Sequence, residues 1–553
     1  MASVAELKEH LAEHSEERPV AFVPTLHSLP AELIERVLIF SDPRDVSRYA
    51  QTCRFARKLV YEPKDQFLWR ELYLGRPFDD LRHAVRLPQR HPVLRFDLTS
   101  DGDQGKSTVF TQWRSEVERR IQAEAIAASD DSDAELLRQA YKTFLAAVDT
   151  AAPMSESDMG PDGKTILSRS ENLRWLDRVL RRTRILDRPI SFSSTPSNTL
   201  AEPAAVSAGT RSHARNAPPR FGAIAEELHQ SRRKLRAYVA LSHESSFNAE
   251  SRARMAEIRR TSRCFVYDMR KYHPETLWGP YRIVHLPYSR ADHSNRTASG
   301  EEEPHGADET LSESDAIPTS GEESVAGEEN HRTTLVVNWE HIEHIMNVVG
   351  LKLRDVSDVC LGYYKKPPFT LEALRAYSAV GSFERPPHDW AGVTGKWRRF
   401  VCFMDYRDLY MFNYSHLPPG PHHVSFFEDP FDEALRPVEL HLSLIPASEY
   451  FSDPSQIPHV LPSPAPVTDE AVDDPAFPTL YFEGHSRGPH ASVASIRGRV
   501  STLADGAIRW QFVTTYDGRM QWRYVRIHDD PAGPFWMIKV NDKLPDGVLN
   551  SLH

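Results

Sequence analysis

Residues 29–69 read LPAELIERVLIFSDPRDVSRYAQTCRFARKLVYEPKDQFLW. The first part of this block repeats its apolar residues at the spacing of an amphipathic helix, with one side formed by Leu29, Leu33, Ile34, Val37, Leu38 and Phe40. Asp42-Pro43 ends that helix and begins the next, because proline suits the first position of a helix. We expect three short helices, which cannot bury so much apolar surface among themselves. Either the rest of the chain or another protein must cover it.

The same block carries the sequence pattern of a known family. The pattern consists of Leu29-Pro30, Glu32-Leu33-Ile34, Asp42-Pro43-Arg44-Asp45, Cys53-Arg54 and Leu68-Trp69-Arg70. In these residues and their spacing, residues 26–73 resemble an F-box, with Ser41 in place of the leucine that usually precedes the turn. Periodicity alone would also fit an ordinary three-helix core that has no partner.

The resemblance implies a partner. An F-box docks a Skp1-type adaptor and, through it, a cullin-based ubiquitin ligase. The contact residues that we expect in this chain are Leu29, Pro30, Leu33, Ile34, Val37, Leu38, Pro43, Val46, Cys53, Leu59 and Trp69.

Composition narrows the class of protein. A length of 553 residues allows several domains, and the net charge of −11 argues against general nucleic-acid binding, which needs a basic surface. The four cysteines are far apart, which predicts no disulfide framework and suits a reducing compartment. The charged N-terminus lacks the apolar run of a signal peptide, and no apolar stretch is long enough to span a membrane. We therefore expect no membrane partner, and a location in the cytoplasm, the nucleus or both.

Polar and helical segments alternate through the first 332 residues. Residues 1–25 predict a flexible leader, and residues 74–187 read as amphipathic helices. Residues 188–220 are rich in Ser, Thr, Ala and Pro, which predicts a disordered linker. Residues 221–288 form a helical segment leading into a β-domain, with strand candidates at 264–267 and 280–286. Residues 289–332 are acidic and have few large apolar side chains, so this insert should be disordered.

Residues 333–541 change in character after Cys360. Short apolar runs separated by proline and glycine predict antiparallel strands at 398–404, 409–412, 424–427, 438–444, 479–482, 495–501, 507–514, 520–527 and 535–540. The loop 450–477 reads as a surface insert. The expected fold class is α+β: an N-terminal helical F-box and a helical region, followed by an antiparallel β-barrel or sandwich with disordered inserts.

The C-terminal region carries a second resemblance. Residues 389–399, 481–484, 505–510 and 533–536 are similar to runs in fungal F-box proteins, whose C-terminal β-domain is related to that of the animal F-box protein that binds cyclin D. This implies a substrate-binding domain. The family commonly has a glycine-rich segment with a further tryptophan between its last strands. Here residues 524–530 run almost directly into Pro531, which bears on whether a barrel closes.

Aromatic and arginine side chains often anchor protein contacts, and the β region has both. Candidate substrate-binding residues are Trp390, Trp397, Arg398, Tyr406, Arg509 and Trp510. The alternative is that most of these aromatics fill the core. Further upstream, one side of the helix predicted over 168–186 carries Arg174, Arg178, Arg181, Arg182 and Arg184. That side is either a solvated surface or a site for an acidic partner.

The sequence also holds a possible catalytic motif. Gly484-His485-Ser486-Arg487-Gly488 fits the nucleophile elbow of a serine hydrolase, but no amphipathic helix follows Ser486 as that mechanism requires. His341 with His344, and His422 with His423, lack the further ligands of a metal site. We therefore expect no catalytic residue, cofactor or metal.

The function that we expect is that of a non-catalytic adaptor. Its F-box docks a Skp1-type partner and its β-domain binds a protein substrate for ubiquitination. Two alternatives stay open: a serine hydrolase that uses Ser486, and an F-box protein that acts outside any ligase.

Overall fold

The structure is a computed structural model. It describes residues 29–84, 112–154, 168–191, 220–240, 249–276, 278–285, 333–357, 370–375, 388–414, 424–428, 431, 433–452, 477–488, 493–516, 519–522 and 534–540. Several sequence predictions lie wholly or mostly outside these residues: the leader 1–25, the linker 188–220, the acidic insert 289–332, the loop 450–477, the segment 524–530 and the pair His422-His423.

The described residues of the N-terminal block fold into four short helices, one more than the three that the spacing predicts. They are α2 (Ala31–Ile39), α3 (Pro43–Ala50), α4 (Arg54–Tyr61) and α5 (Phe67–Leu74). Asp42 caps α3 by accepting a hydrogen bond from the amide of Arg44 at 2.9 Å, and Pro43 occupies the first helical position. Trp69 of α5 donates its indole N–H to the carbonyl of Val60 at 2.8 Å, which fixes α5 against α4.

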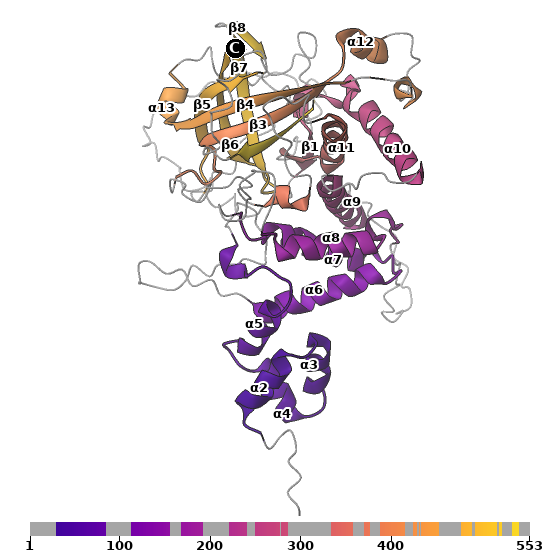
Figure 1. Cartoon of the computed structure of the whole chain (residues 1–553), viewed down its shortest axis with the longest axis vertical. Helices are drawn as coiled ribbons and strands as arrows, with labels where there is room; N and C mark the ends of the chain where they lie inside the picture. The colour runs from indigo at the N-terminus through magenta and orange to yellow at the C-terminus, as the bar shows by residue number, and fades with distance from the viewer. Residues whose placement is uncertain are drawn as a thin grey trace, which may run out of the picture.

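Longer helices continue the same hydrophobic core away from the N-terminal block. They are α6 (Trp113–Ala128), α7 (Ala134–Asp149), α8 (Glu171–Arg182) and α9 (Arg220–Ala240). The cluster runs without a break from Ile34 of α2 to Leu235 of α9. Figure 1 shows the N-terminal helices at one end of the elongated molecule, the sheet at the other, and α6 to α9 between them. None of the helices in the described part of the chain has the length and apolarity needed to cross a membrane.

A buried polar hub joins the segment that follows α5 to α6, to the residues after α7 and to the start of α8. The carboxylate of Asp79 accepts hydrogen bonds from the amides of Ala152 and Glu171, both at 2.8 Å, and from the hydroxyl of Ser170. The side chain of Asn172 accepts from the amide of Asp79 at 3.1 Å and from the buried guanidinium of Arg120 at 2.6 Å. These bonds satisfy polar groups that would otherwise be costly to bury.

The hub extends toward the C-terminal half through the 3₁₀ turn η9 (Leu371–Leu374). The buried guanidinium of Arg375 donates to the carbonyls of Ala152 at 2.7 Å and Pro153 at 2.9 Å. Glu372 accepts from the amide of Ser170 at 3.3 Å. Residues more than 200 positions apart in the chain therefore meet at one buried network.

Two further helices lie between the hub region and the sheet: α10 (Ala249–Val266) and α11 (Trp339–Asp355). The strands β1 (Tyr281–His285) and β2 (Thr333–Val337) form a two-stranded antiparallel sheet beside them.

The main sheet has seven antiparallel strands in the order β8-β7-β6-β5-β4-β3-β9. They are β3 (Gly395–Phe403), β4 (Ala434–Ile445), β5 (Leu480–Arg487), β6 (Val493–Thr502), β7 (Ile508–Tyr516), β8 (Arg519–Trp522) and β9 (Phe535–Val540). The prediction of an antiparallel β-domain is confirmed. The described strands form one curled sheet, a half-barrel with β8 and β9 at its edges, and not a two-sheet sandwich.

Two glycines permit the close approach of strands in this sheet. A Cβ atom added at Gly484 would lie 1.9 Å from the carbonyl oxygen of His441, and one at Gly498 would lie 2.4 Å from that of Gln511. Any larger residue would force β4 away from β5, or β6 away from β7. These glycines are therefore required by backbone proximity.

The two faces of the sheet are covered differently. On the inner face, Leu440, Phe482 and Val500 are buried in a cluster that also includes Trp397 and Trp510. On the opposite face, Phe400 and Ile538 of β3 and β9 pack against α10 and α11. The remainder of that opposite face, over β4 to β7, carries mostly polar side chains.

Three predicted strands are wrong. Residues 409–412 lie in the helix α12 (Tyr406–Tyr414), residues 424–427 form the 3₁₀ turn η10 (Val424–Phe427), and residues 264–267 belong to the end of α10. Short apolar runs do not distinguish a strand from a buried helical turn. In α12 the apolar positions Leu409 and Phe412 are three apart and pack on one cluster, so tertiary burial selects the helix.

Candidate functional site

An apolar stripe lies exposed along α2. The exposed fractions are 39% for Leu29, 51% for Leu33, 53% for Val37 and 89% for Phe40. Leu33, Val37 and Phe40 are four and three residues apart, so they follow one edge of the helix. A contiguous exposed row of large apolar side chains marks a protein-interaction surface. We call these four residues the α2 stripe.

The structure separates the predicted partner-contact residues into two groups. Exposed or half-buried are Leu29, Pro30, Leu33, Val37 and Cys53. Buried inside the N-terminal block are Ile34, Leu38, Pro43, Val46, Leu59 and Trp69. The buried group holds the helices together, because a fully buried side chain has no surface left for a partner. Phe40 and Phe55, which the sequence did not single out as contacts, are exposed instead.

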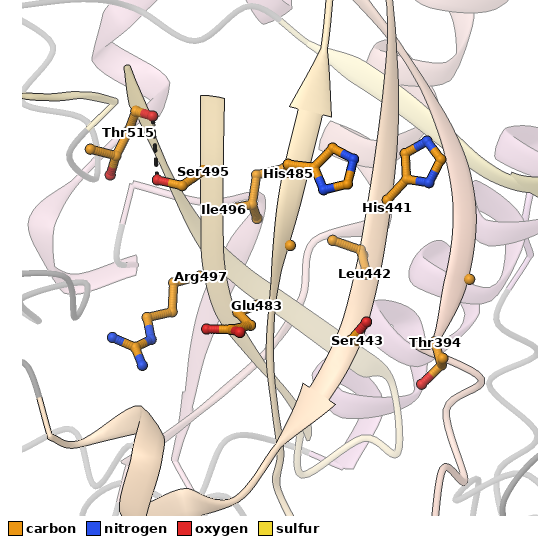
Figure 2. A pocket seen from close by; sticks show the side chains of 12 residues that line it. Thr394, His441, Leu442, Ser443, Glu483, His485, Ser495, Ile496, Arg497 and Thr515 are labelled. Atoms are coloured by element: carbon orange, nitrogen blue, oxygen red, sulfur yellow. Dashed lines mark hydrogen bonds between the residues drawn. The ribbon is translucent and has the colours of Figure 1, made fainter. Parts of the chain in front are cut away.

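A second feature is a hollow on the polar face of the sheet, with a volume of about 650 Å³. It crosses β4, β5 and β6 and touches the start of β3 and the end of β7 (Figure 2). Its lining consists of Thr394, Gly395, His441, Leu442, Ser443, Glu483, Gly484, His485, Ser495, Ile496, Arg497 and Thr515. No local pattern in the sequence predicts this set, because its members meet only through strand register.

Two histidines stack at one side of this hollow. The rings of His441 and His485 are parallel to within 7°, with centroids 4.7 Å apart. His441 Nε2 lies 2.9 Å from Glu439 Oε1, so this nitrogen donates to the carboxylate. Partial burial and the neighbouring His441 lower the pKa of His485, while Glu439 acts in the opposite direction. Figure 2 shows the two imidazoles side by side, with Glu483 and Arg497 on the neighbouring part of the wall.

Comparison with known families identifies the N-terminal block. Residues 26–75 match the family model described as F-box-like. These residues are an F-box-like domain. The α2 stripe is therefore an exposed surface of an F-box-like domain, and the match covers none of the β region. No curated protein and no solved structure matches the chain.

The six predicted substrate-binding residues do not gather at one place. Trp390, Trp397 and Trp510 belong to the inner-face cluster, with the rings of Trp397 and Trp510 5.0 Å apart in an edge arrangement. Arg398 follows Trp397 in β3 and so faces the opposite side of the sheet. Arg509 is buried, with its guanidinium 5.3 Å from the ring centre of Tyr281.

Tyr406, the sixth of these residues, lies exposed on α12, away from both faces of the sheet. The structure thus brings three of the six together, and it places those three among residues of the core.

Ser486 lies within the strand β5, opposite Leu440 of β4 and Ala494 of β6. Its side chain is buried. A nucleophile elbow needs an exposed serine at a sharp turn between a strand and a helix. The hydrolase interpretation of Gly484–Gly488 is therefore wrong, because Gly484 to Arg487 lie within the strand β5 and Ser486 is at no turn.

His341 and His344 are buried in α11 and bonded to neighbouring hydroxyls. His344 Nδ1 lies 3.0 Å from the hydroxyl of Ser262, and His341 Nε2 lies 3.1 Å from that of Tyr272. Burial lowers the pKa of His341 to about 4 and that of His344 to about 3. Among the residues that the structure describes, no group of three His, Cys, Asp or Glu side chains is placed to hold a metal ion.

These histidines predict a stability that falls in acid. Their folded-state pKa values lie below the ordinary 6.5, so the unfolded chain binds more protons between these values. Stability is present above pH 6.5 and declines as the pH falls toward 4. At pH 5.5 the two histidines together should lower the free energy of unfolding by roughly 3 kcal/mol relative to about pH 7.5. Urea unfolding at these two pH values measures the loss.

His344→Gln, which preserves a partner for Ser262, should remove part of this pH dependence. The exposed His273 provides the control, because His273→Gln should leave the pH dependence unchanged. An equal effect of both substitutions would contradict the explanation.

The predicted arginine side of α8 is exposed. Arg174 pairs with Glu171 at 2.6 Å and Arg181 pairs with Asp177 at 2.7 Å, both within one helical turn. Such local pairs are typical of a solvated helix surface. The acidic-partner interpretation of this surface stays a prediction.

Proposed function

We propose that this chain is the substrate-recognition subunit of a Skp1–cullin–F-box ubiquitin ligase. The observation that carries the proposal is the α2 stripe, a row of exposed large apolar side chains on an F-box-like domain. Burying those side chains against a Skp1-type adaptor would remove them from water, and apolar burial is the main source of such binding energy.

Proximity is the proposed mechanism. The F-box-like domain attaches the chain to the ligase, and the β-domain holds a protein substrate near the transferring cysteines of other subunits. The buried network of Asp79, Asn172 and Arg120 supports this role, because it links the domain firmly to the helices that lead to the sheet. The chain itself supplies binding and geometry, and no catalytic group.

The resemblance of the C-terminal region extends the proposal. Residues 389–399 and 533–536 are similar to runs in the β-domain of fungal F-box proteins, which is related to that of the animal F-box protein that binds cyclin D. We infer a comparable substrate-binding role for the half-barrel, in the cytoplasm or nucleus where cullin ligases work.

Co-precipitation with a cullin tests the proposal. The full-length chain should recover both a Skp1-type adaptor and a cullin from cell extract. Recovery of the adaptor without any cullin would instead support an F-box protein that acts outside a ligase. Recovery of neither would overturn both proposals.

A further inference from the structure

The polar face of the sheet has its charges arranged in rows that cross the strands. Strand register places Lys396, His441 and His485 side by side on β3, β4 and β5, continued by Ser495 and Thr515 on β6 and β7. A second row, two residues further along β3, contains Arg398, Glu439 and Arg487. A third row, two residues further along β4, contains Ser443, Glu483 and Arg497.

These rows are positive in a chain whose net charge is −11. Four permanent cations, Lys396, Arg398, Arg487 and Arg497, stand against the two carboxylates of Glu439 and Glu483. The stacked pair His441 and His485 lies in the middle row and gains further positive charge on protonation. The surface therefore complements a negatively charged ligand.

The spacing of the rows matches that of an extended polypeptide. Side chains on one face of a strand are two residues apart, which is about 6.6–6.8 Å, and the three rows are separated by this same repeat. An extended segment that lies along β4 and β5 presents every second side chain to the sheet at that interval. Acidic residues at alternate positions would then each meet one row.

We propose that the hollow over β4 to β6 binds an extended acidic segment of a protein, with alternate Asp or Glu carboxylates against these rows and the central one against His441 and His485. This inference deepens the proposed function by naming the class of substrate. It rests on the proposed function, because the bound segment is a substrate only if the chain serves a ligase. Figure 2 shows both imidazoles among the side chains that line the hollow.

The interspersed acids decide between classes of anionic partner. Glu483 is exposed beside Arg497 on the wall, and Glu439 bonds to His441. A nucleic-acid backbone carries a negative charge on every nucleotide and would place some of these charges against both carboxylates, whereas a polypeptide can place neutral or donor side chains opposite them. The occupant that fits is therefore an acidic peptide segment.

Acid should strengthen this binding. The charged and titratable groups around His485 are Lys396 on β3, Glu439 and His441 on β4, Glu483 and Arg487 on its own strand, and Arg497 on β6. Partial burial of the ring and the neighbouring His441 lower the pKa of His485, against the opposite effect of Glu439, so free His485 favours its neutral form. A bound carboxylate favours the protonated form, so binding takes up a proton and tightens as the pH falls.

Fluorescence anisotropy with the purified full-length chain tests the proposal. The probe is a labelled peptide of about seven residues in which Glu and Ser alternate, which covers three rows at the strand repeat. A peptide of the same composition with its Glu residues in one block serves for comparison. We expect the alternating peptide to bind more tightly, and roughly fivefold more tightly at about pH 6 than at about pH 7.5.

Variants locate the site. His485→Gln should abolish the pH dependence, and Arg497→Gln should weaken binding at both pH values by roughly tenfold, as expected for a lost charged contact. The matched control is Arg407→Gln, which removes an almost fully exposed arginine on α12 and should change nothing. His485→Gln and Arg407→Gln should keep the thermal unfolding midpoint of the parent chain, because both side chains are exposed. Arg497 also donates to the carbonyl of Glu449 at 2.9 Å, so the unfolding midpoint of Arg497→Gln is measured together with its affinity.

Three results would overturn the inference: equal affinity for the two peptides, binding without pH dependence, or tighter binding of single-stranded RNA that the same variants abolish. Failure here is separable from failure of the proposed function. His485→Gln should still co-purify with a Skp1-type adaptor, and a chain that binds the peptide but no adaptor would refute the ligase role alone.

Discussion

Replacing Leu33 and Val37 with aspartate should abolish co-purification of the chain with a Skp1-type adaptor. Both side chains are about half exposed on the α2 stripe, so burial by a partner gains about 1 kcal/mol from each. A carboxylate left unpaired in the interface costs a further 1–3 kcal/mol or so per site. The sum, about 5 kcal/mol, corresponds to a loss of affinity of more than about 1,000-fold.

These positions isolate binding from folding. Ile34 beside them is fully buried, so an aspartate there would disrupt the domain and leave the result ambiguous. The matched control is Met411→Asp with Phe451→Asp, because both of those side chains are as exposed as Val37 and lie outside the N-terminal block. The control variant should keep the adaptor. Adaptor recovery by the Leu33→Asp and Val37→Asp double variant, measured by pull-down, would refute the assigned docking surface.

Asp79→Ala should strongly destabilise the helical part of the chain. The substitution leaves the amides of Ala152 and Glu171 and the hydroxyl of Ser170 without their acceptor in a buried place. Each unsatisfied buried donor costs about 1–3 kcal/mol, so we expect a loss of about 4 kcal/mol in the free energy of unfolding of the helical part. Urea unfolding followed by tryptophan fluorescence measures this loss.

Hydrogen exchange should show which elements Asp79→Ala destabilises. Amides of α5 and α8 should lose protection in Asp79→Ala, because the hub no longer joins these helices, while amides of β4 and β5 should be unaffected. Asp45→Ala is the matched control, since Asp45 makes an exposed ion pair with Arg48 and its loss should cost less than about 0.5 kcal/mol. Equal destabilisation by the two variants would contradict the role of the hub.

The local sequence was a good guide where one element contains its own signal. The repeat of Leu33, Val37 and Phe40 predicted an amphipathic α2, and Asp42-Pro43 predicted the start of α3. Alternation predicted most strands of the β region, including β9 at its observed bounds. These signals are carried by backbone preference and side-chain periodicity within a few residues.

The same signals failed for short apolar runs. Residues 409–412 fit a strand as well as a helical turn, and the choice was made by Phe412 packing against Phe427 and Met404. Ser486 is a similar case: its motif fits a catalytic turn, yet pairing with Leu440 and Ala494 holds it in a strand. Neither contact is visible from neighbours in the chain.

The candidate sites also differ in how much of each could be predicted from the sequence. The family pattern over Leu29–Arg70 identified the F-box-like domain without any structure. Which side of α2 stays exposed was decided by the fold, because Ile34 and Leu38 are buried in the core of the domain while Leu33 and Val37 are not. The hollow with His441 and His485 depends wholly on strand register, which pairs these two residues although they are 44 positions apart in the chain.

The sequence by itself therefore determined the helical N-terminal domain, its family and the antiparallel character of the C-terminal region, because local periodicity and spacing carry that information. Tertiary structure alone decided which apolar residues remain exposed, that the described strands form one half-barrel, and which charges share a row across it. Burial and strand register are properties of contacts between distant segments, and a single sequence does not contain them in any local pattern.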